Sequence, residues 1–349
     1  MDVALFDFEL PPGQIAQHPA PERDASRLLV LDRAAGCTRA HTTVAGLPEH
    51  LRAGDLLVTN DTRVFPARLL GRRDPSGGAV ECLLLRRLDE ERWEALVHPG
   101  QKLKPGRRAV FEGHGLALRA EILERHFHGR RTIRLWAEGG RAVDDVVDAI
   151  GHVPLPPYIH RADEREDRER YQTVFARARG SVAAPTAGLH FTGRLLDRVE
   201  ALGVERAEVT LHVGYGTFKP VHAERVEEHR VDEETYEISE DAAARIERAR
   251  RDRRRVIAVG TTTTRTLEAA ALRGEGRVQP GRAATDLFIY PGFRFQVLDG
   301  LFTNFHLPRS SLLMLVAAFA GREPVLEAYR EAVARGYRFY SYGDAMLVL

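Results

Sequence analysis

The chain of 349 residues is 44% hydrophobic and 29% charged, with a formal net charge of +1, which is typical of a globular protein of about two domains and says nothing of a polyanionic partner. Two distant cysteines, Cys37 and Cys82, exclude a disulfide framework and a zinc site. No signal peptide is visible, and the most apolar helical stretch, residues 312–320, is too short to cross a bilayer. We therefore expect a cytoplasmic protein with no membrane partner.

The first predicted strands lie at residues 28–31 and 56–58. The second is followed by a polar cluster that contains Asn60, Asp61 and Arg63. Open α/β sheets bind ligands at the carboxyl ends of their strands, so these side chains are candidates to face a substrate. A plain turn network explains the same residues equally well.

Residues 66–151 have a different texture. Short alternating runs such as VECLLL, RWEALV and RRTIRLWA are separated by Gly, Pro and Asp, which predicts a small all-β barrel or sandwich. The stiff segment GHVPLPPY then returns the chain. We predict an α/β (mixed) main domain, residues 1–65 plus 152–349, interrupted by an inserted all-β small barrel domain at residues 66–151.

Cations are concentrated within this insert. Between residues 98 and 134 three glutamates stand against nine lysines and arginines: Lys102, Lys104, Arg107, Arg108, Arg119, Arg125, Arg130, Arg131 and Arg134. His98, His114, His126 and His128 lie in the same stretch. Such an excess is expected where a protein contacts a phosphate backbone, although a solvated face is the commoner explanation.

Residues 181–221 carry a histidine before each of two changes of element. Thr192 is a candidate cap for a helix that ends at Gly203, and residues 207–213 then alternate as a half-buried strand does. His212 lies on the polar face of this strand, before the glycine-broken loop 214–217, and His190 lies in the loop AAPTAGLHF. Two imidazoles in adjacent loops are typical of an α/β active site, although each alone is more often a packing residue.

A helix is predicted at residues 237–255, followed by a buried strand at 256–260. Thr261, Thr262, Thr263, Thr264 and Arg265 come next, before the helix LEAAALRG. Hydroxyls at a helix N-terminus after a strand can bind an anion or a nucleotide. Capping alone explains one or two of these threonines, and the P-loop lysine and second glycine are missing.

The last third is predicted to contain a strand at residues 285–293, closed by a Pro-Gly turn, and helices at 311–321 and 324–335. Asn304 and His306 lie in the loop between the strand and the first helix. The terminal run YRFYSYGDAM could stack on bases, but an aromatic run is more often core. No G-x-G-x-x-G, G-x-S-x-G or metal-ligand spacing is found, so we expect no dinucleotide site and no metal.

Long motifs along nearly the whole chain closely resemble one enzyme family. They are AAPTAGLHFT, VTLHVGYGTFKPV, VIAVGTTTTRTLE, FIYPGFRFQVLDGLFTNFHLPRSSLLMLVAAFAG and YRFYSYGDAML, with LLVTNDTRVFPARLLG and GHVPLPPYI nearer the N-terminus. The chain is identified by them as similar to the S-adenosylmethionine:tRNA ribosyltransferase-isomerases of queuosine synthesis. The family fold is an α/β domain interrupted by a small β-barrel, in agreement with the predicted insert.

The resemblance implies a reaction. The ribosyl part of S-adenosylmethionine is transferred onto 7-aminomethyl-7-deazaguanine at the tRNA wobble position and isomerised, which gives epoxyqueuosine and releases adenine and methionine. S-adenosylmethionine is then a consumed substrate, and no cofactor is expected. A base must remove the proton beside the sulfonium, and adenine must leave with the help of a proton or hydrogen bond to its ring. His190 and His212 are catalytic candidates for either role, with Asp61 as a carboxylate alternative. The residues expected to bind substrate are Asn60, Arg63, Thr186, Gly214, Gly216, Thr217, Thr261, Thr262, Arg265, Asn304, His306, Tyr342 and Asp344.

Two other functions stay open, as do the tRNA-binding domain and the oligomeric state, for which we expect a monomer. One alternative is an RNA-binding module of the same fold without catalysis, and the other is methyl transfer to RNA, which lacks its glycine-rich loop here. The chain also departs from the family. Many members carry His-Ser-Glu after the histidine at 229, where this chain has Asp232-Glu233-Glu234.

Overall fold

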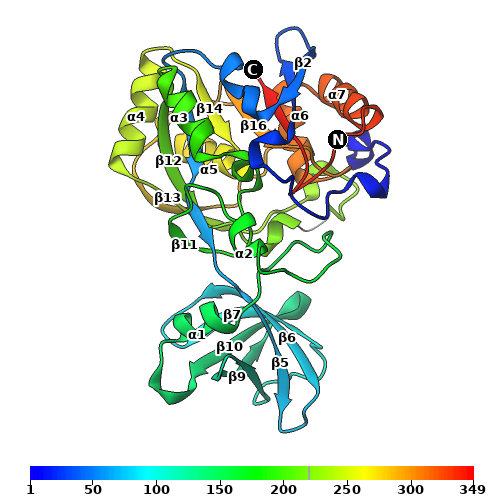
Figure 1. The fold of residues 1–349 in the computed structure, drawn as a ribbon, viewed down its shortest axis with the longest axis vertical. Helices are drawn as coiled ribbons and strands as arrows, with labels where there is room; N and C mark the ends of the chain where they lie inside the picture. Colours follow the sequence, from blue (N-terminus) through cyan, green and yellow to red (C-terminus); the bar gives the residue numbers. More distant parts are fainter. Residues whose placement is uncertain (219–220) are drawn as a thin grey trace.

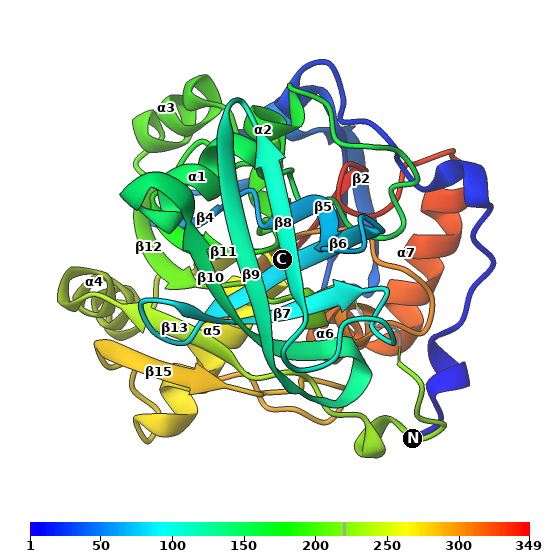
Figure 2. The same cartoon turned by 90° about the horizontal axis from the view of Figure 1, so that it is seen from below.

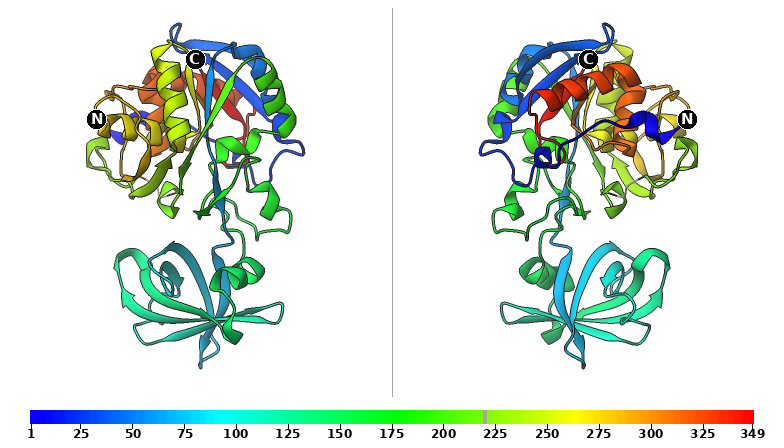
Figure 3. Two further views of the ribbon diagram at one scale, coloured as in Figure 1. Left: turned by 90° about the vertical axis from the view of Figure 1, so that its left-hand side faces the viewer. Right: turned by 90° about the vertical axis from the view of Figure 1, so that its right-hand side faces the viewer.

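The computed structural model describes residues 1–218 and 221–349, with only the backbone of His128 and Phe218. Lys219 and Pro220, which belong to the motif VTLHVGYGTFKPV, lie outside the described residues. Two lobes are joined by a narrow neck (Figures 1 and 3). The larger lobe is an α/β domain and the smaller a β-barrel, so the predicted fold class is confirmed.

A mixed sheet forms the centre of the larger lobe. In the described residues it has nine strands in the order β15-β13-β12-β3-β14-β16-β17-β1-β2. Their bounds are β1 Arg27–Asp32, β2 Cys37–Thr43, β3 Leu56–Asn60, β12 Glu205–Leu211, β13 Glu234–Ile238, β14 Val256–Val259, β15 Gly281–Thr285, β16 Gly300–Asn304 and β17 Ala345–Val348. The strands β12, β3, β14 and β16 run parallel to one another, so their carboxyl ends meet at one edge of the sheet.

Helices cover both faces of this sheet because its strands are apolar on both sides, as buried parallel strands are. Leu29 and Leu31 of β1 face the core beneath α4 (Glu240–Arg251), α5 (Thr261–Arg273), α6 (Ser311–Ala320) and α7 (Arg322–Ala334). Leu28 and Val30 face the opposite core, which α3 (Gly193–Ala201) covers. Alternate residues of one strand thus stabilise two separate layers.

The smaller lobe is a closed barrel with the strand order β10-β7-β6-β5-β8-β9, seen from below in Figure 2. Its strands are β5 Arg68–Asp74, β6 Ala79–Arg87, β7 Arg92–His98, β8 Arg108–Gly113, β9 Leu116–Arg125 and β10 Arg130–Ala137. The helix α1 (Val143–Ile150) packs against β8, β9 and β10. All six strands lie between residues 66 and 151, and the exact domain boundaries at 65 and 152 stay a prediction.

A two-stranded parallel sheet lies at the junction between the lobes. The chain leaves the main domain through β4 (Thr62–Val64) and comes back to pair with it through β11 (Ala178–Ser181). The short helix α2 (Asp167–Arg170) lies between the barrel and β11. The insertion point therefore directly follows the carboxyl end of β3, where the ligand site was predicted.

Three predicted elements have different bounds in the structure. The helix predicted at 237–255 begins only at Glu240, because residues 234–238 alternate in burial as strand β13 and Ser239 caps the helix. The threonine run lies inside α5 rather than before it. The strand predicted at 285–293 is instead β15 at Gly281–Thr285, followed by irregular chain.

Candidate active site

The carboxyl edge of the four parallel strands gathers loops from distant parts of the sequence. Asn60 ends β3, Gly260 follows β14 and Asn304 ends β16. His212 comes directly after β12, whose alternation was correctly predicted, with Ala207, Val209 and Leu211 buried. This edge therefore holds the polar residues that the sequence singled out in four separate stretches.

Asn304 links three of these loops. Its Nδ2 donates to Nε2 of His190 at 3.0 Å and to the carbonyl of Tyr340 at 3.1 Å, while its Oδ1 accepts from the hydroxyl of Thr186 at 3.1 Å. Asn304 and His190 are both buried. The structure thus brings together the three predicted residues Thr186, His190 and Asn304.

These contacts determine the chemical state of the buried histidines. Since Nε2 of His190 accepts a hydrogen bond, its proton lies on Nδ1 and its lone pair is occupied. Burial lowers the pKa of His190 to about 3, and burial likewise lowers the pKa of His306, whose Nε2 contacts the hydroxyl of Thr303, to about 3. Both rings are neutral near pH 7, which makes them hydrogen-bonding groups rather than imidazolium acids.

The first turn of α5 faces the same edge. Gly260 precedes it with φ +91°, a conformation that favours glycine, and the free N–H groups of the turn carry the positive end of the helix dipole. Thr263 and Thr264 donate their hydroxyls to carbonyls one turn back, at Val259 and Gly260. Of the four threonines, only Thr261 and Thr262 line the small cavity at this edge of the sheet, which is described below as the inner cavity.

A buried ion pair lies one turn further along α5. Nη1 of Arg265 pairs with Oε2 of Glu234, and its Nε donates to the carbonyl of Leu287 at 2.9 Å. The other oxygen of Glu234 accepts from the backbone of Gly214 at 2.9 Å and from the hydroxyl of Thr217 at 3.2 Å. Glu234, which was not predicted as a site residue, therefore ties the predicted loop 214–217 to Arg265.

Four cavities meet at residues 213–217, which we call the hub loop. The inner cavity, of about 40 Å³, has Thr186, Thr261, Thr262, Asn304, His306, Val213 and Thr217 among its lining residues. The arginine cavity, of about 80 Å³, is lined by Arg265 and Glu234 and shares Thr217 with the inner cavity. Two larger hollows lie on either side of the neck. Each is lined in part by Tyr215 of the hub loop.

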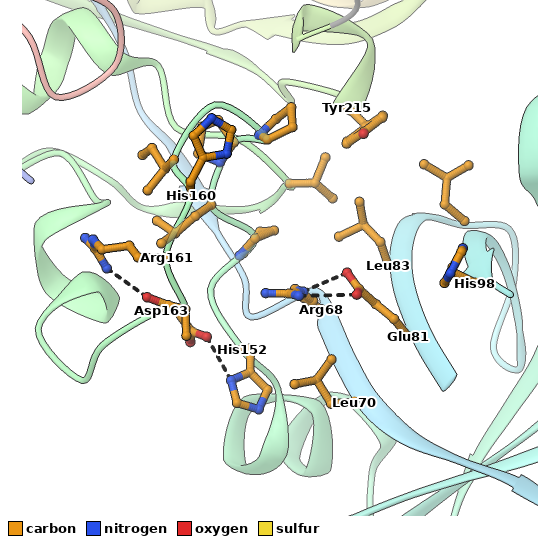
Figure 4. Close-up of a pocket in the computed structure, with 18 of the residues that line it drawn as sticks. Arg68, Leu70, Glu81, Leu83, His98, His152, His160, Arg161, Asp163 and Tyr215 are labelled. Atoms are coloured by element: carbon orange, nitrogen blue, oxygen red, sulfur yellow. Dashed lines mark hydrogen bonds and ion pairs between the residues drawn. The ribbon is translucent and has the colours of Figure 1, made fainter. Parts of the chain in front are cut away.

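The larger hollow, the proline-side groove of about 770 Å³, is shown in Figure 4. Its barrel wall carries the bidentate pair Arg68–Glu81, and the pair between His152 and Asp163 lies beside it, because the backbones of Arg68 and His152 are hydrogen-bonded to each other. The second hollow, the His212 cleft of about 520 Å³, is lined by Trp93 and Arg130 from the barrel and by His212 and Asp232 from the main domain. A substrate in either hollow would contact both lobes.

Nδ1 of His212 contacts the hydroxyl of Thr62. The oxygen of Thr62 lies 2.8 Å from Nδ1 of His212, 2.8 Å from Oγ of Ser181 and 3.3 Å from the carbonyl of Ala178. When the Thr62 hydroxyl donates to that carbonyl, its oxygen accepts from Nδ1–H and the lone pair of His212 lies on Nε2. Nε2 has no hydrogen-bond partner among residues 1–218 and 221–349. Burial lowers the pKa of His212, while Asp61 raises it, so the ring is neutral near pH 7.

Other predicted residues lie where they support the backbone. Asn60 exchanges two hydrogen bonds with Leu211, at 3.0 Å each, and so joins the ends of β3 and β12. Asp61 pairs with Arg177 at 3.0 Å and accepts from Thr210 at 2.6 Å. Arg63 points to solvent. These contacts are those of the turn network that was the alternative interpretation.

Some C-terminal residues likewise support the structure, whereas others line the inner cavity. The hydroxyl of Tyr342 donates to Asp167 at 2.9 Å, and Asp344 accepts from the backbone N–H groups of Arg27 and Arg338. Tyr340 and Ser341 line the inner cavity instead, together with Tyr158, whose hydroxyl bonds that of Ser341. These three residues were missed. The aromatic run was interpreted as core, although φ of +76° at Tyr340 marks a sharp turn.

The described residues contain no helix long and apolar enough to cross a membrane and no group of three or more His, Cys, Asp or Glu side chains placed to hold a metal ion. The polar groups at the carboxyl edge include hydroxyls, amides, neutral histidines and a helix N-terminus. Together with an open groove between two lobes, these groups are typical of an α/β enzyme that acts on a polar substrate.

Comparison with known proteins identifies the family. The family described as "Queuosine biosynthesis protein" matches residues 3–348, and the chain belongs to it. S-adenosylmethionine:tRNA ribosyltransferase-isomerases from Desulfitobacterium hafniense and Symbiobacterium thermophilum are 53% and 54% identical, with complete coverage of both chains in each case. The crystal structure of S-adenosylmethionine tRNA ribosyltransferase from Thermotoga maritima is 40% identical, with a TM-score of 0.55 over 99% of this chain and 100% of that one.

Proposed function

We propose that the protein is an S-adenosylmethionine:tRNA ribosyltransferase-isomerase. It transfers and isomerises the ribosyl moiety of S-adenosylmethionine onto 7-aminomethyl-7-deazaguanine at the tRNA wobble position, giving epoxyqueuosine-tRNA, adenine and methionine. The single observation that carries this proposal is identity above 50% over the complete chain to relatives with this activity in their name. The protein acts as a monomer in the cytoplasm.

S-adenosylmethionine binds at the inner and arginine cavities in this proposal, and because these cavities of about 40 and 80 Å³ are too small for the whole ligand, their walls at the hub loop must move apart to admit it. The two cavities share Thr217, so an elongated ligand can extend from one into the other. The N-terminus of α5 and the Arg265–Glu234 pair offer donors and a carboxylate to the polar ends of the ligand. The ligand is consumed in the reaction, and no further cofactor is needed.

His212 is the base in this proposal. The positive sulfur acidifies the ribose carbon beside it, and a histidine that removes this proton must be neutral, with an accessible lone pair. Nε2 of His212 meets this requirement in the tautomer with its proton on Nδ1, from a cleft that shares Val213 with the inner cavity, whereas the lone pair of His190 already accepts from Asn304. We assign His190 to the support of the inner cavity and the tRNA base to the junction between the lobes.

The test is an incubation of the protein with S-adenosylmethionine and tRNA that bears 7-aminomethyl-7-deazaguanine, followed by mass spectrometry of nucleosides and small molecules. Epoxyqueuosine with free adenine and methionine is the expected result. S-adenosylhomocysteine would indicate methyl transfer. If the protein is folded and binds the tRNA but leaves it unmodified, the protein would be an RNA-binding module without catalysis.

A further inference from the structure

The cations of the insert fall into two groups in the structure. Five of the nine are engaged: Arg108 with Glu121, Arg119 with Asp74, Arg130 with Asp232, Arg134 with Glu91, and Arg131 with backbone carbonyls inside the barrel. The other four are exposed, and within the described chain their side chains form no ion pair or hydrogen bond. We call these four the basic rim: Lys102, Lys104, Arg107 and Arg125.

The loop 99–107 is built to present its lysines. Leu103 is fully buried in the barrel core, and Arg131 donates to the carbonyls of Gly100 at 2.8 Å and Leu103 at 3.3 Å. Because Leu103 points inward, its neighbours Lys102 and Lys104 are left exposed on either side of it. A buried guanidinium and a buried leucine thus hold two lysines outward.

The two arginines belong to the same end of the barrel. The carbonyl of Arg107 accepts from Ile122 of β9 at 2.9 Å, which places the end of the loop beside that strand. Arg125 ends β9 and is the cross-strand partner of Arg131, the residue that anchors the loop. The rim therefore surrounds Arg131 at one end of the barrel.

This end of the barrel adjoins the junction between the lobes. His98, directly before the loop, and Gly129 line the proline-side groove (Figure 4), while Arg130 lines the His212 cleft. A strand of RNA lying across the rim would thus pass the openings of both hollows. Cations without acidic partners lose no existing ion pair when they bind phosphates.

We propose that the basic rim binds the sugar–phosphate backbone of the tRNA substrate, next to the wobble nucleotide that enters the junction. This inference rests on the proposed function and adds the domain that contacts the RNA. The contacts are electrostatic and independent of sequence, so they affect RNA affinity and its salt dependence rather than the chemical step. Each phosphate contact contributes about 0.7–0.9 to the slope of log affinity against log salt concentration.

The experiment compares two quadruple variants with the same change in net charge. The rim variant carries Lys102→Gln, Lys104→Gln, Arg107→Gln and Arg125→Gln. The control carries Arg72→Gln, Arg92→Gln, Arg108→Gln and Arg134→Gln, which are exposed barrel cations in ion pairs. Fluorescence anisotropy measures the affinity for a labelled anticodon stem-loop with 7-aminomethyl-7-deazaguanine from 50 to 200 mM KCl (roughly the range over which such contacts are strongly screened).

We expect the salt slope of the rim variant to fall by about 3 and its KM for the RNA to rise at least tenfold, with kcat and the KM for S-adenosylmethionine retained. The control should keep its slope within about 1. Equal slopes for the rim variant and the control would overturn the inference, as would a rim variant that loses affinity for heparin but not for the RNA. Absence of epoxyqueuosine with the wild-type protein would instead refute the proposed function, because RNA binding is measured separately.

Discussion

Replacing Asn304 with leucine should destabilise the main domain selectively. The side chain has nearly the same shape, but it can make none of the three hydrogen bonds that asparagine makes to Thr186, His190 and Tyr340. A buried polar group that loses its partner costs about 1–3 kcal/mol. Since the three groups share one site and Thr186 is only half-buried, we expect a loss of about 3–5 kcal/mol in the free energy of unfolding.

The two lobes can be followed separately in one sample. Both tryptophans of the chain, Trp93 and Trp136, lie in the barrel, on β7 and β10. Tryptophan fluorescence during urea unfolding therefore reports the barrel. Circular dichroism at 222 nm, a helix signal, reports mainly the main domain, which carries six of the seven α-helices in the described residues. Asn304→Leu should lower the midpoint of the dichroism transition. The fluorescence transition should stay close to that of the wild type if the lobes unfold independently.

A loss of less than about 1 kcal/mol would refute the reasoning, because it would mean that the three polar groups find other partners or water at no cost. The same variant should raise the KM for S-adenosylmethionine, since Thr186 and Tyr340 both line the inner cavity. If the variant were destabilised but still bound S-adenosylmethionine tightly, Asn304 would stabilise the main domain without shaping the ligand site, which would contradict its place in the proposed site.

Three further predictions concern the site. His212→Ala should lower kcat by about 100-fold or more. In the wild type, kcat/KM should fall with decreasing pH only below pH 6.5, because burial lowers the pKa of His212 and only its neutral ring accepts a proton. An unchanged pH–rate profile in the variant would contradict this role. Thr261→Val should raise the KM for S-adenosylmethionine, whereas Thr263→Val, which loses only a hydrogen bond to the carbonyl of Val259 at the end of β14, should leave it within about twofold. The folded-state pKa values of His190 and His306, about 3, lie below the unfolded value of 6.5. The contribution of the two neutral rings to the free energy of unfolding is therefore fully present above pH 6.5 and is lost as pH falls toward 3, by up to about 1.4 kcal/mol per pH unit for each histidine. Urea unfolding at pH 7 and pH 5 measures this loss.

Local patterns predicted those elements whose signals are local. The alternation of residues 207–213 predicted which side chains of β12 are buried, and Thr192 caps α3 as expected, with its hydroxyl accepting from Leu195 at 3.0 Å. Short alternating runs predicted a barrel because each strand pairs with a near neighbour in the chain. The helix start at Glu240 was missed because Glu237 is a good helix former that here lies on the exposed side of a strand.

The site itself depends on contacts that no local pattern encodes. Glu234 meets Arg265 from 31 positions away, and Asn304 meets His190 from 114 positions away. The threonine run illustrates the limit. In the sequence, each of the four threonine hydroxyls is an equally good candidate to bind a ligand. Only the structure shows that the hydroxyls of Thr263 and Thr264 donate to nearby backbone carbonyls instead.

The insertion point of the barrel lies next to His212 and the hub loop. The strands β4 and β11 flank the insert in the chain and supply two hydroxyls beside His212: that of Thr62, which contacts Nδ1 of His212, and that of Ser181, which contacts the hydroxyl of Thr62. Ser181 also accepts from the backbone of Val213, at 2.7 Å, at the start of the hub loop. A change in the pairing of β4 with β11 would therefore alter both the contact between Thr62 and His212 and the wall that Val213 forms between the inner cavity and the His212 cleft.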